Sequence, residues 1–429
     1  MTHVLRSTTA FILFFLAACD TRADLFTEYK VKSGTAERTY YVHKAESMTK
    51  PLPLVVVLHG GGGNGKLLKD TYGFKQFLER GECIAVYPDA LKGGWVPDDV
   101  AFVDVVIDEV FAREKVDRER LFVTGASRGG LLTFVMAAKS KHKIRAAGTV
   151  IATHLQGLAD EFPLQRPIDF AMIAGTADPL MPYDGGWGSF GKPKTTGDPK
   201  ARSMSVDDTI KLLLKANSLT EAPKVTTLGD NDTSDGCTNE VRTWIDPKTR
   251  HRVMLVKVVG GGHVVPGGAQ YLPKAQIGPA CNDFHHAEVM WNFLKSAGQP
   301  ELVVAKEGTS PPAAKLSDES EKALRERVSG LFEALRAGDI EKCLELSDPA
   351  VVKEKGKPAA EKFFKSVSGL IKLARVKPED RTIQSIVPSA DGQSARVTIE
   401  LKLNGKSQPP GVEVWGLVDG KWFYRETTK

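Results

Sequence analysis

The chain has 429 residues and a formal net charge of +5, which is small against its 58 basic and 53 acidic residues. Its length predicts two folded units rather than one small domain, and its 41% hydrophobic and 26% charged residues are ordinary for a soluble globular protein. The sequence has no basic stripe with interleaved aromatic residues, which argues against a nucleic-acid-binding protein, and no apolar run reaches the roughly 18 residues of a membrane-spanning helix.

The N-terminus has the features of an export signal. Arg6 precedes a short apolar run at residues 10–18, and the run ends in LAAC (16–19). This ending resembles a bacterial lipobox, in which the cysteine receives a lipid. We therefore expect residues 1–19 to be a lipoprotein signal peptide and Cys19 to be lipidated, so that the exported protein lies on a membrane of the cell envelope without crossing it. An ordinary cleavage site with an incidental cysteine, which would release an extracellular protein, is the alternative.

Short apolar runs then alternate with helical patterns. Because the runs are unbroken rather than alternating, they predict strands covered on both faces, as in a parallel sheet. The predicted strands lie at 53–58, 83–87, 121–124, 144–151, 168–174 and 252–259, and the predicted helices near 65–80, 100–114, 129–140, 205–217 and 285–296. This order predicts an α/β domain with a mostly parallel sheet over residues 20–298. A Gly/Pro/Lys-rich stretch at 184–202 interrupts it, either as a surface insert or as a loop over a functional face.

A change in composition marks a second unit. Residues 299–316 have the proline and alanine content of a linker. Beyond it, residues 319–347 have helical spacing, and the end of the chain alternates as strands do, with an Asp419-Gly420 hairpin turn. Helices followed by strands predict a smaller α+β domain over residues 317–429. In its element order and closing hairpin this domain resembles the nuclear-transport-factor-2-like domains.

The motif GASRGG (125–130) is the strongest pointer to chemistry. It follows the apolar run 121–124 and precedes the helical pattern 129–140. A serine on a tight turn between strand and helix is the nucleophile elbow of hydrolases, and its glycines let the strand and the helix come close together. A glycine-x-serine-x-glycine match alone is weak, so Ser127 is a candidate nucleophile mainly because of this context.

A serine nucleophile needs a base and an acid that orients the base. His263 is the candidate base, because it lies in a glycine-rich turn directly after the strand at 252–259. Asp178 is the candidate acid, because it follows the strand at 168–174 in the same way. Asp184 is the competing candidate for the acid. Asp178 also has a purely structural interpretation, as an Asx-turn residue before proline. His154, directly after the run 144–151, is a weaker candidate for contacting substrate.

The glycine-rich segment HGGGGNG (59–65) follows the first strand of the α/β pattern. It lacks the lysine-serine/threonine ending of a phosphate-binding loop. It suits an oxyanion loop, in which bare backbone amides approach a negatively charged oxygen, and the amides of Gly61 and Arg128 are the candidate donors. The ring of His59 is expected to brace this loop beside the substrate.

The cysteines and the remaining histidines indicate no metal or other cofactor. Cys237 and Cys281 lie in loop-like sequence on either side of one strand, and an oxidising compartment would allow a disulfide between them. Cys83 and Cys343 fall in patterns typical of a buried core. His285 and His286 lack the companion ligands of a zinc site and are expected at a solvated helix start near the edge of the sheet.

Together these segments resemble the secreted α/β-hydrolases of the polyhydroxybutyrate depolymerase and feruloyl or acetyl-xylan esterase group. The matching stretches occur in order over residues 35–297, and they are LHGGGGN (58–64), GASRGG (125–130), AGTADPLMPY (174–183) and GGGHVVPGG (260–268). The resemblance implies an α/β-hydrolase fold, with Ser127, Asp178 and His263 as catalytic residues and Gly61 and Arg128 as oxyanion donors. It also implies a substrate-binding role for Trp95. Arg128 departs from the family, which usually has a small or polar residue there.

The sequence therefore predicts a serine hydrolase that cleaves feruloyl, acetyl or hydroxyalkanoate esters, including polymeric ones, without a cofactor. Two alternatives remain. One is a serine peptidase of the prolyl-oligopeptidase kind, which shares the order of the three catalytic residues, and the other is a non-catalytic cell-surface binding protein. The sequence does not fix the oligomeric state or the role of the C-terminal domain.

Overall fold

A computed structural model describes residues 24–46, 48–91, 94–188, 202–299, 316–388, 394–403, 406–407 and 411–425. The predicted signal peptide and Cys19 lie outside these residues, as does most of the insert at 184–202 and nearly all of the linker at 299–316. No helix within the described ranges combines the length and the apolar character needed to cross a membrane.

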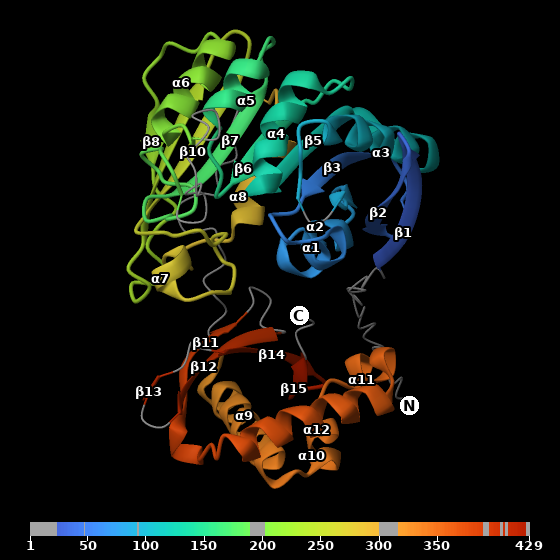
Figure 1. Cartoon of the computed structure of the whole chain (residues 1–429), viewed down its shortest axis with the longest axis vertical. Coiled ribbons are helices and arrows are strands. Elements are labelled where there is room, and N and C mark those ends of the chain that lie inside the picture. The colour runs from blue at the N-terminus through green and yellow to red at the C-terminus, as the bar shows by residue number, and fades with distance from the viewer. Residues whose placement is uncertain are drawn as a thin grey trace, which may run out of the picture.

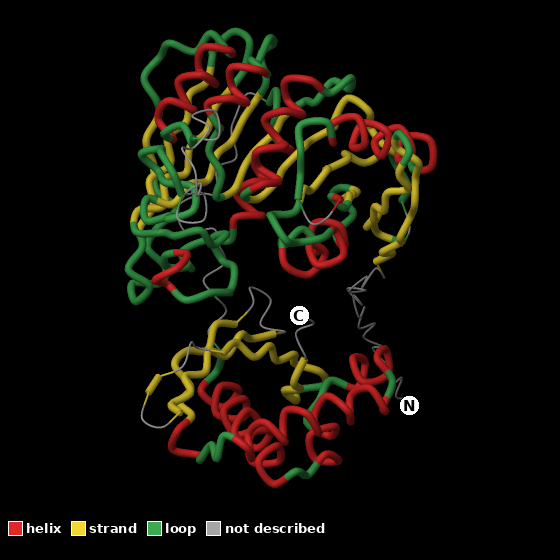
Figure 2. Tube along the Cα trace, in the orientation of Figure 1, coloured by secondary structure: helices red, strands yellow, loops and turns green. Residues whose placement is uncertain are grey.

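A ten-stranded sheet forms the centre of the larger unit (Figures 1 and 2). Its strands, in spatial order, are β1 (Asp24–Ser33), β2 (Ala36–Ala45), β4 (Ile84–Pro88), β3 (Leu52–Leu58), β5 (Val116–Ala126), β6 (Ala146–Val150), β7 (Asp169–Gly175), β10 (Arg252–Val259), β9 (Thr238–Ile245) and β8 (Lys224–Thr226). The central strands, from β4 to β10, are parallel, and the strands at both edges are antiparallel. This confirms the predicted α/β class, and the strand order is that of an α/β-hydrolase.

Helices cover both faces of this sheet. The helices of this unit are α1 (Gly65–Thr71), α2 (Lys75–Glu79), α3 (Asp99–Arg113), α4 (Arg128–Lys139), α5 (Gln156–Glu161), α6 (Val206–Ala216), α7 (Lys274–Ile277) and α8 (His286–Lys295). Side chains of α3, α4 and α6 share a core with Leu54, Val56 and Leu58 of β3. Side chains of α1, α2 and α8 share a second core with Val55 and Val57, which point the other way from the same strand. The unbroken apolar runs are thus explained by burial on both faces.

Two differences from the sequence prediction have a local cause. The helix expected at 65–80 is two short helices, α1 and α2, because the chain between them passes through Gly73 at φ +77°, which a continuous helix does not allow. The sequence does not predict the outer antiparallel strands β1, β2, β9 and β8, because each has alternating or polar composition rather than an apolar run. They lengthen the sheet beyond its buried centre.

The smaller unit has a core of its own. Its helices come first, as α9 (Asp318–Ala337), α10 (Ile340–Glu345), α11 (Pro349–Lys355) and α12 (Lys357–Leu373), and its strands follow, as β11 (Arg381–Pro388), β12 (Ser394–Leu403), β13 (Lys406–Ser407), β14 (Gly411–Val418) and β15 (Lys421–Arg425). The strands form an antiparallel sheet, and Figure 2 shows the helices on one side of it. Leu324, Trp415 and Trp422 are among the side chains buried between the two layers. The predicted α+β class is confirmed, whereas the resemblance to the nuclear-transport-factor-2-like domains remains a prediction.

Candidate active site

Ser127 lies on the turn between β5 and α4. Its backbone has φ 51° and ψ −117°, a conformation that costs a non-glycine residue roughly 1–3 kcal/mol and is found mainly at functional sites. The amide of Ser127 donates to the carbonyl of Val150 on β6, and its carbonyl accepts from Leu131 in the first turn of α4. The turn is therefore held from both sides, and the side chain of Ser127 is only half-buried.

The glycines around Ser127 are required by packing. A Cβ atom at Gly125 would lie 2.5 Å from the carbonyl carbon of Gly129, and one at Gly129 would lie 2.2 Å from the carbonyl oxygen of Leu58 on β3. These are backbone atoms, which cannot move aside as the end of a flexible side chain can. The absence of side chains at these two positions lets α4 start directly against the sheet.

Gly129→Ala is therefore expected to destabilise the larger unit by about 1–3 kcal/mol through overpacking. The measurement is the unfolding temperature of this unit by calorimetry. Gly369→Ala on α12 of the smaller unit is the comparison, because no atom lies within 4 Å of the added carbon there. A helical glycine replaced by alanine gains about 0.5–1 kcal/mol, so the unfolding temperature of the smaller unit should not fall. Equal unfolding temperatures for Gly129→Ala and the parent chain would contradict the packing explanation.

Three side chains form a hydrogen-bonded series at the carboxyl edge of the sheet. The Ser127 hydroxyl donates to Nε2 of His263 over 2.9 Å. Nδ1 of His263 in turn donates to Oδ2 of Asp178 over 2.7 Å. His263 follows β10 and Asp178 follows β7, so the parallel strands β5, β7 and β10 deliver all three residues to one edge. Such a series can remove a proton from the serine hydroxyl while the imidazole stays in one tautomer.

Asp178 holds its position through a second set of bonds. Its Oδ1 accepts the amides of Leu180 and Met181 over 2.8 and 2.9 Å. Asp178 is thus an Asx-turn residue and the partner of His263 at once, since each function uses a different oxygen. Asp184 is exposed and makes no hydrogen bond to His263 within the described residues. The geometry therefore favours Asp178 over Asp184 as the carboxylate that orients His263.

The amides proposed as oxyanion donors lie beside Ser127. Arg128 is the first residue of α4, where an amide has no partner inside the helix and the helix dipole favours negative charge. Neither the amide of Arg128 nor that of Gly61 donates a hydrogen bond within the described part of the chain. Gly60, the neighbour of Gly61, lies against Ser127: a Cβ atom at Gly60 would be 3.7 Å from the Cβ atom of Ser127. Gly61 and Arg128 thus line the same cavity as Ser127, and their amides remain the candidate oxyanion donors.

His59 and Trp95, both expected near substrate, brace each other. Nε2 of His59 accepts the amide of Ala90 over 3.0 Å, and Nδ1 donates to the carbonyl of Gly60 over 2.7 Å. The indole of Trp95 donates to the carbonyl of His59 over 2.8 Å and packs on its ring. Burial lowers the pKa of His59, so its ring is neutral near pH 7. Both ring nitrogens of His59 are thus occupied by backbone groups, which is compatible with the expected bracing function.

A cavity of about 1070 Å³ opens in front of Ser127 and His263. Its walls are mainly apolar, with Leu67, Leu180 and Val264 among them. Two aromatic residues on its rim were not singled out in the sequence. Tyr271 is 57% exposed and donates from its hydroxyl to the carbonyl of His263, and Trp187 is 37% exposed. Both are exposed aromatics in loops, and only the position of a loop in space shows that it borders a cavity.

The other histidines have structural explanations. His154 is buried, stacks on Phe134 and lines a separate cavity, so the structure does not place it with Ser127. Burial lowers its pKa to about 3. The helix start expected at His286 is confirmed, but the expectation that it is solvated is wrong: His286 is fully buried at the start of α8, and its Nδ1 donates to the carbonyl of Pro266. Burial lowers its pKa to about 4.

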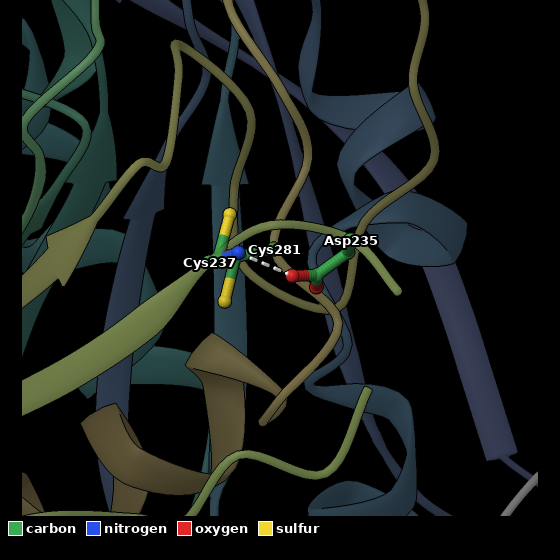
Figure 3. A group of neighbouring side chains, drawn as sticks. All are labelled: Asp235, Cys237 and Cys281. Carbon is green, nitrogen blue, oxygen red and sulfur yellow. Dashed lines mark hydrogen bonds between the residues drawn. The ribbon is translucent and has the colours of Figure 1, made fainter. Parts of the chain in front are cut away.

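The disulfide considered between Cys237 and Cys281 is not formed in this structure. Both residues are buried and close together, but they are free thiols (Figure 3). Each thiol has an acceptor of its own at 3.8 Å, which is the carbonyl of Ala280 for Cys237 and the carboxylate of Asp283 for Cys281. The two sulfur atoms lie within 4.8 Å of each other with no disulfide bond between them.

The same two cysteines and Asp235 form the one cluster with metal-ligand spacing among the described residues, with donor atoms within 4.8 Å of one another. Both carboxylate oxygens of Asp235 are already used by backbone amides, those of Cys237 at 2.7 Å and Asn282 at 2.6 Å. The carboxylate therefore closes a turn, and its hydrogen bonds account for the cluster without an ion.

No protein-family model matches the chain, but several curated proteins do. A protein named putative esterase NocK, from Nocardia uniformis subsp. tsuyamanensis, is 27% identical over 280 residues, which cover 60% of this chain and 79% of that protein. Feruloyl esterase C from Emericella nidulans is 31% identical over 147 residues, 32% of this chain and 53% of that enzyme. The chain thus spans about half the length of the feruloyl esterases that it matches.

Solved structures give weaker similarity. An acetyl xylan esterase from Aspergillus awamori superposes with a TM-score of 0.39 at 14% identity, over 54% of this chain and 92% of that one. A putative dienelactone hydrolase from Klebsiella pneumoniae gives 0.33 at 17% identity, over 46% and 81%. Because both scores are low, the fold assignment depends on the strand order and direction in this chain.

Proposed function

We propose that this chain, an α/β-hydrolase related to esterases, hydrolyses carboxylic esters through an acyl-enzyme on Ser127. The observation that carries the proposal is the hydrogen-bonded series Ser127–His263–Asp178 at the wall of a large, mainly apolar cavity. The similarity to proteins named esterase supports it independently.

In the first half of the reaction, Ser127 Oγ attacks the ester carbonyl carbon while Nε2 of His263 takes its proton. The carbonyl oxygen becomes negatively charged, and the amides of Gly61 and Arg128 stabilise it by hydrogen bonds. Asp178 stabilises the imidazolium through the bond to Nδ1. The carbon–oxygen bond to the alcohol then breaks, and the alcohol leaves with the proton from His263.

In the second half, a water molecule attacks the acyl group on Ser127. His263 removes a proton from the water and later returns it to Ser127 Oγ as the acyl–oxygen bond breaks. The products are an alcohol and a carboxylic acid, and the two halves use the same groups with no cofactor.

The substrate class that we propose is feruloyl, acetyl or hydroxyalkanoate esters, including those linked to polymers. The names of the relatives support the first two, since they include feruloyl esterases and a bifunctional acetylxylan esterase/xylanase from Neocallimastix patriciarum. The size of the cavity, about 1070 Å³, is sufficient for an aromatic acyl group together with part of an alcohol. The aromatic rim residues Trp187 and Tyr271 suit contacts with such groups.

A substrate panel tests this proposal. Purified protein is assayed with p-nitrophenyl acetate, methyl ferulate, acetylated xylan and poly-3-hydroxybutyrate, and with a chromogenic prolyl peptide. We expect cleavage of esters at a rate well above the uncatalysed one, and an intact peptide. Faster cleavage of the peptide would replace the proposal with a peptidase. Failure to cleave any substrate, together with no labelling of Ser127 by a fluorophosphonate, would favour a non-catalytic binding protein.

Export and anchoring are part of the same proposal. The lipobox-like LAAC (16–19) supports lipidation of Cys19, which would hold the enzyme at a membrane surface where it meets extracellular or periplasmic esters. We also propose that residues 317–429 fold as an accessory domain behind the linker 299–316.

A further inference from the structure

The proposed ester hydrolysis leaves the charged side chain of Arg128 without a function. The proposed reaction needs only its backbone amide. Arg128 is the only charged residue (Asp, Glu, Lys or Arg) among the described residues that line the cavity in front of Ser127. Among the described lining residues, the cavity thus has a single permanent positive charge and mainly apolar walls.

The side chain of Arg128 lies across two glycines. A Cβ atom at Gly61 would be 3.1 Å from Cδ of Arg128, and one at Gly94 would be 2.8 Å from its Nη1. The aliphatic stem therefore runs past Gly61 and the guanidinium reaches Gly94. Side chains at these two positions would collide with the arginine in this conformation, so the glycines leave the space that it fills.

The guanidinium has no partner within the described residues. It takes part in no hydrogen bond or ion pair there, although arginines elsewhere in the chain, such as Arg38 with Asp99, are paired. Arg128 also lines a second cavity of about 460 Å³, and it shares this position between the two cavities with Leu131 and Leu155. Glu161 lines that second cavity, but it forms no ion pair with Arg128 within 4.0 Å.

An unpaired guanidinium offers several N–H donors in a plane, and the group that matches this geometry is a carboxylate. Asp178, the nearby acid of the proposed mechanism, is occupied by His263, Leu180 and Met181 and cannot serve as that partner. The donors of Arg128 are thus available to a substrate that enters the cavity.

We propose that Arg128 selects esters that carry a carboxylate a few atoms away from the scissile bond. This proposal depends on the proposed function, since it names the substrate class of the same site. The carboxylate would bind the guanidinium at the junction of the two cavities while the ester carbonyl lies against Ser127 Oγ. An ester of a hydroxy acid or of an acidic sugar has this chemistry, whereas a neutral ester leaves the guanidinium without a partner.

The test compares three substrates that differ in charge but share one leaving group. They are mono-p-nitrophenyl adipate, which is anionic, its neutral primary amide p-nitrophenyl adipamate, and the cationic p-nitrophenyl 6-aminohexanoate. We expect kcat/KM for the anion to exceed that for the amide by about tenfold, as one charge-assisted hydrogen bond allows. The preference should fall as NaCl is added, because the guanidinium is exposed to solvent.

Variants of Arg128 separate its side chain from its amide. Arg128→Lys should keep part of the preference for the anion, Arg128→Gln should remove it, and Arg128→Glu should reverse it in favour of the cation. Arg166→Gln is the matched control, since it removes the same charge from a residue that precedes β7, at the opposite end of the strand from Asp178, and the anion-to-amide ratio should not change.

Two results overturn this inference while leaving the proposed function standing. One is equal kcat/KM for the adipate and the adipamate in the parent chain. The other is a loss of activity in Arg128→Gln by the same factor for all three substrates, which would place the guanidinium at the reacting carbonyl instead. Failure of the folded parent chain to hydrolyse any of the three esters overturns the proposed function as well.

Discussion

Ser127→Ala is expected to lower kcat for p-nitrophenyl acetate by about 10⁴-fold or more, because the variant has no oxygen that can form the acyl-enzyme. The residual rate should come only from stabilisation of the oxyanion by the two backbone amides and from direct attack by water. The measurement is initial-rate kinetics at saturating substrate, with the p-nitrophenolate release corrected for spontaneous hydrolysis. The fold should persist, since the lost hydroxyl makes one hydrogen bond, to His263.

Ser366→Ala provides the matched control for this change. Ser366 is an exposed serine on α12, and its hydroxyl donates to the carbonyl of Lys362. This variant also loses one serine hydroxyl, but away from the proposed site, so its rate should equal that of the parent chain. Circular dichroism of both variants checks folding. Undiminished turnover by folded Ser127→Ala would rule out the acyl-enzyme mechanism.

Asp178→Asn is expected to lower kcat by about 10³–10⁴-fold with little change in KM. The amide oxygen of asparagine can still accept the amides of Leu180 and Met181, which turns the NH₂ group toward His263. Nδ1 of His263 must then accept a hydrogen bond instead of donating one. The proton moves to Nε2, and Nε2 can no longer take the proton of Ser127.

Asp184→Asn is the matched control, because Asp184 is the exposed carboxylate that competes with Asp178 in the sequence. The same change of charge there should leave kcat within about twofold. Stopped assays over a range of substrate concentrations give kcat and KM separately for both variants. A large loss in Asp184→Asn combined with a small one in Asp178→Asn would exchange the two assignments.

Local sequence was sufficient to predict the elements that carry the proposed site. The unbroken runs at 53–58, 121–124, 168–174 and 252–259 predict buried strands, because a strand covered on both faces has apolar residues at every position. The structure has a strand at each of these places. The glycines of GASRGG are required by contacts of the backbone with its immediate neighbours, so they too could be interpreted from sequence.

Side-chain contacts between distant residues could not be derived in this way. His263 is 85 residues from Asp178 and 136 residues from Ser127, and nothing in the local pattern sets the distance between them. The order of β5, β6, β7 and β10 in the sheet decides it, because parallel neighbours end at the same edge. Sequence reasoning could only propose these residues from their positions after strands.

The sequence by itself therefore determined the class of the fold and the candidate residues of the proposed site, since strand burial, helix spacing and turn geometry depend on neighbours along the chain. Tertiary structure decided how these residues meet. It brought His263 and Asp178 within hydrogen-bond distance, gave Cys237 and Cys281 separate acceptors, and left the guanidinium of Arg128 without a partner among the described residues. The physical reason is that hydrogen-bond partners and cavities arise from packing between elements far apart in the chain, which depends on the topology of the whole sheet.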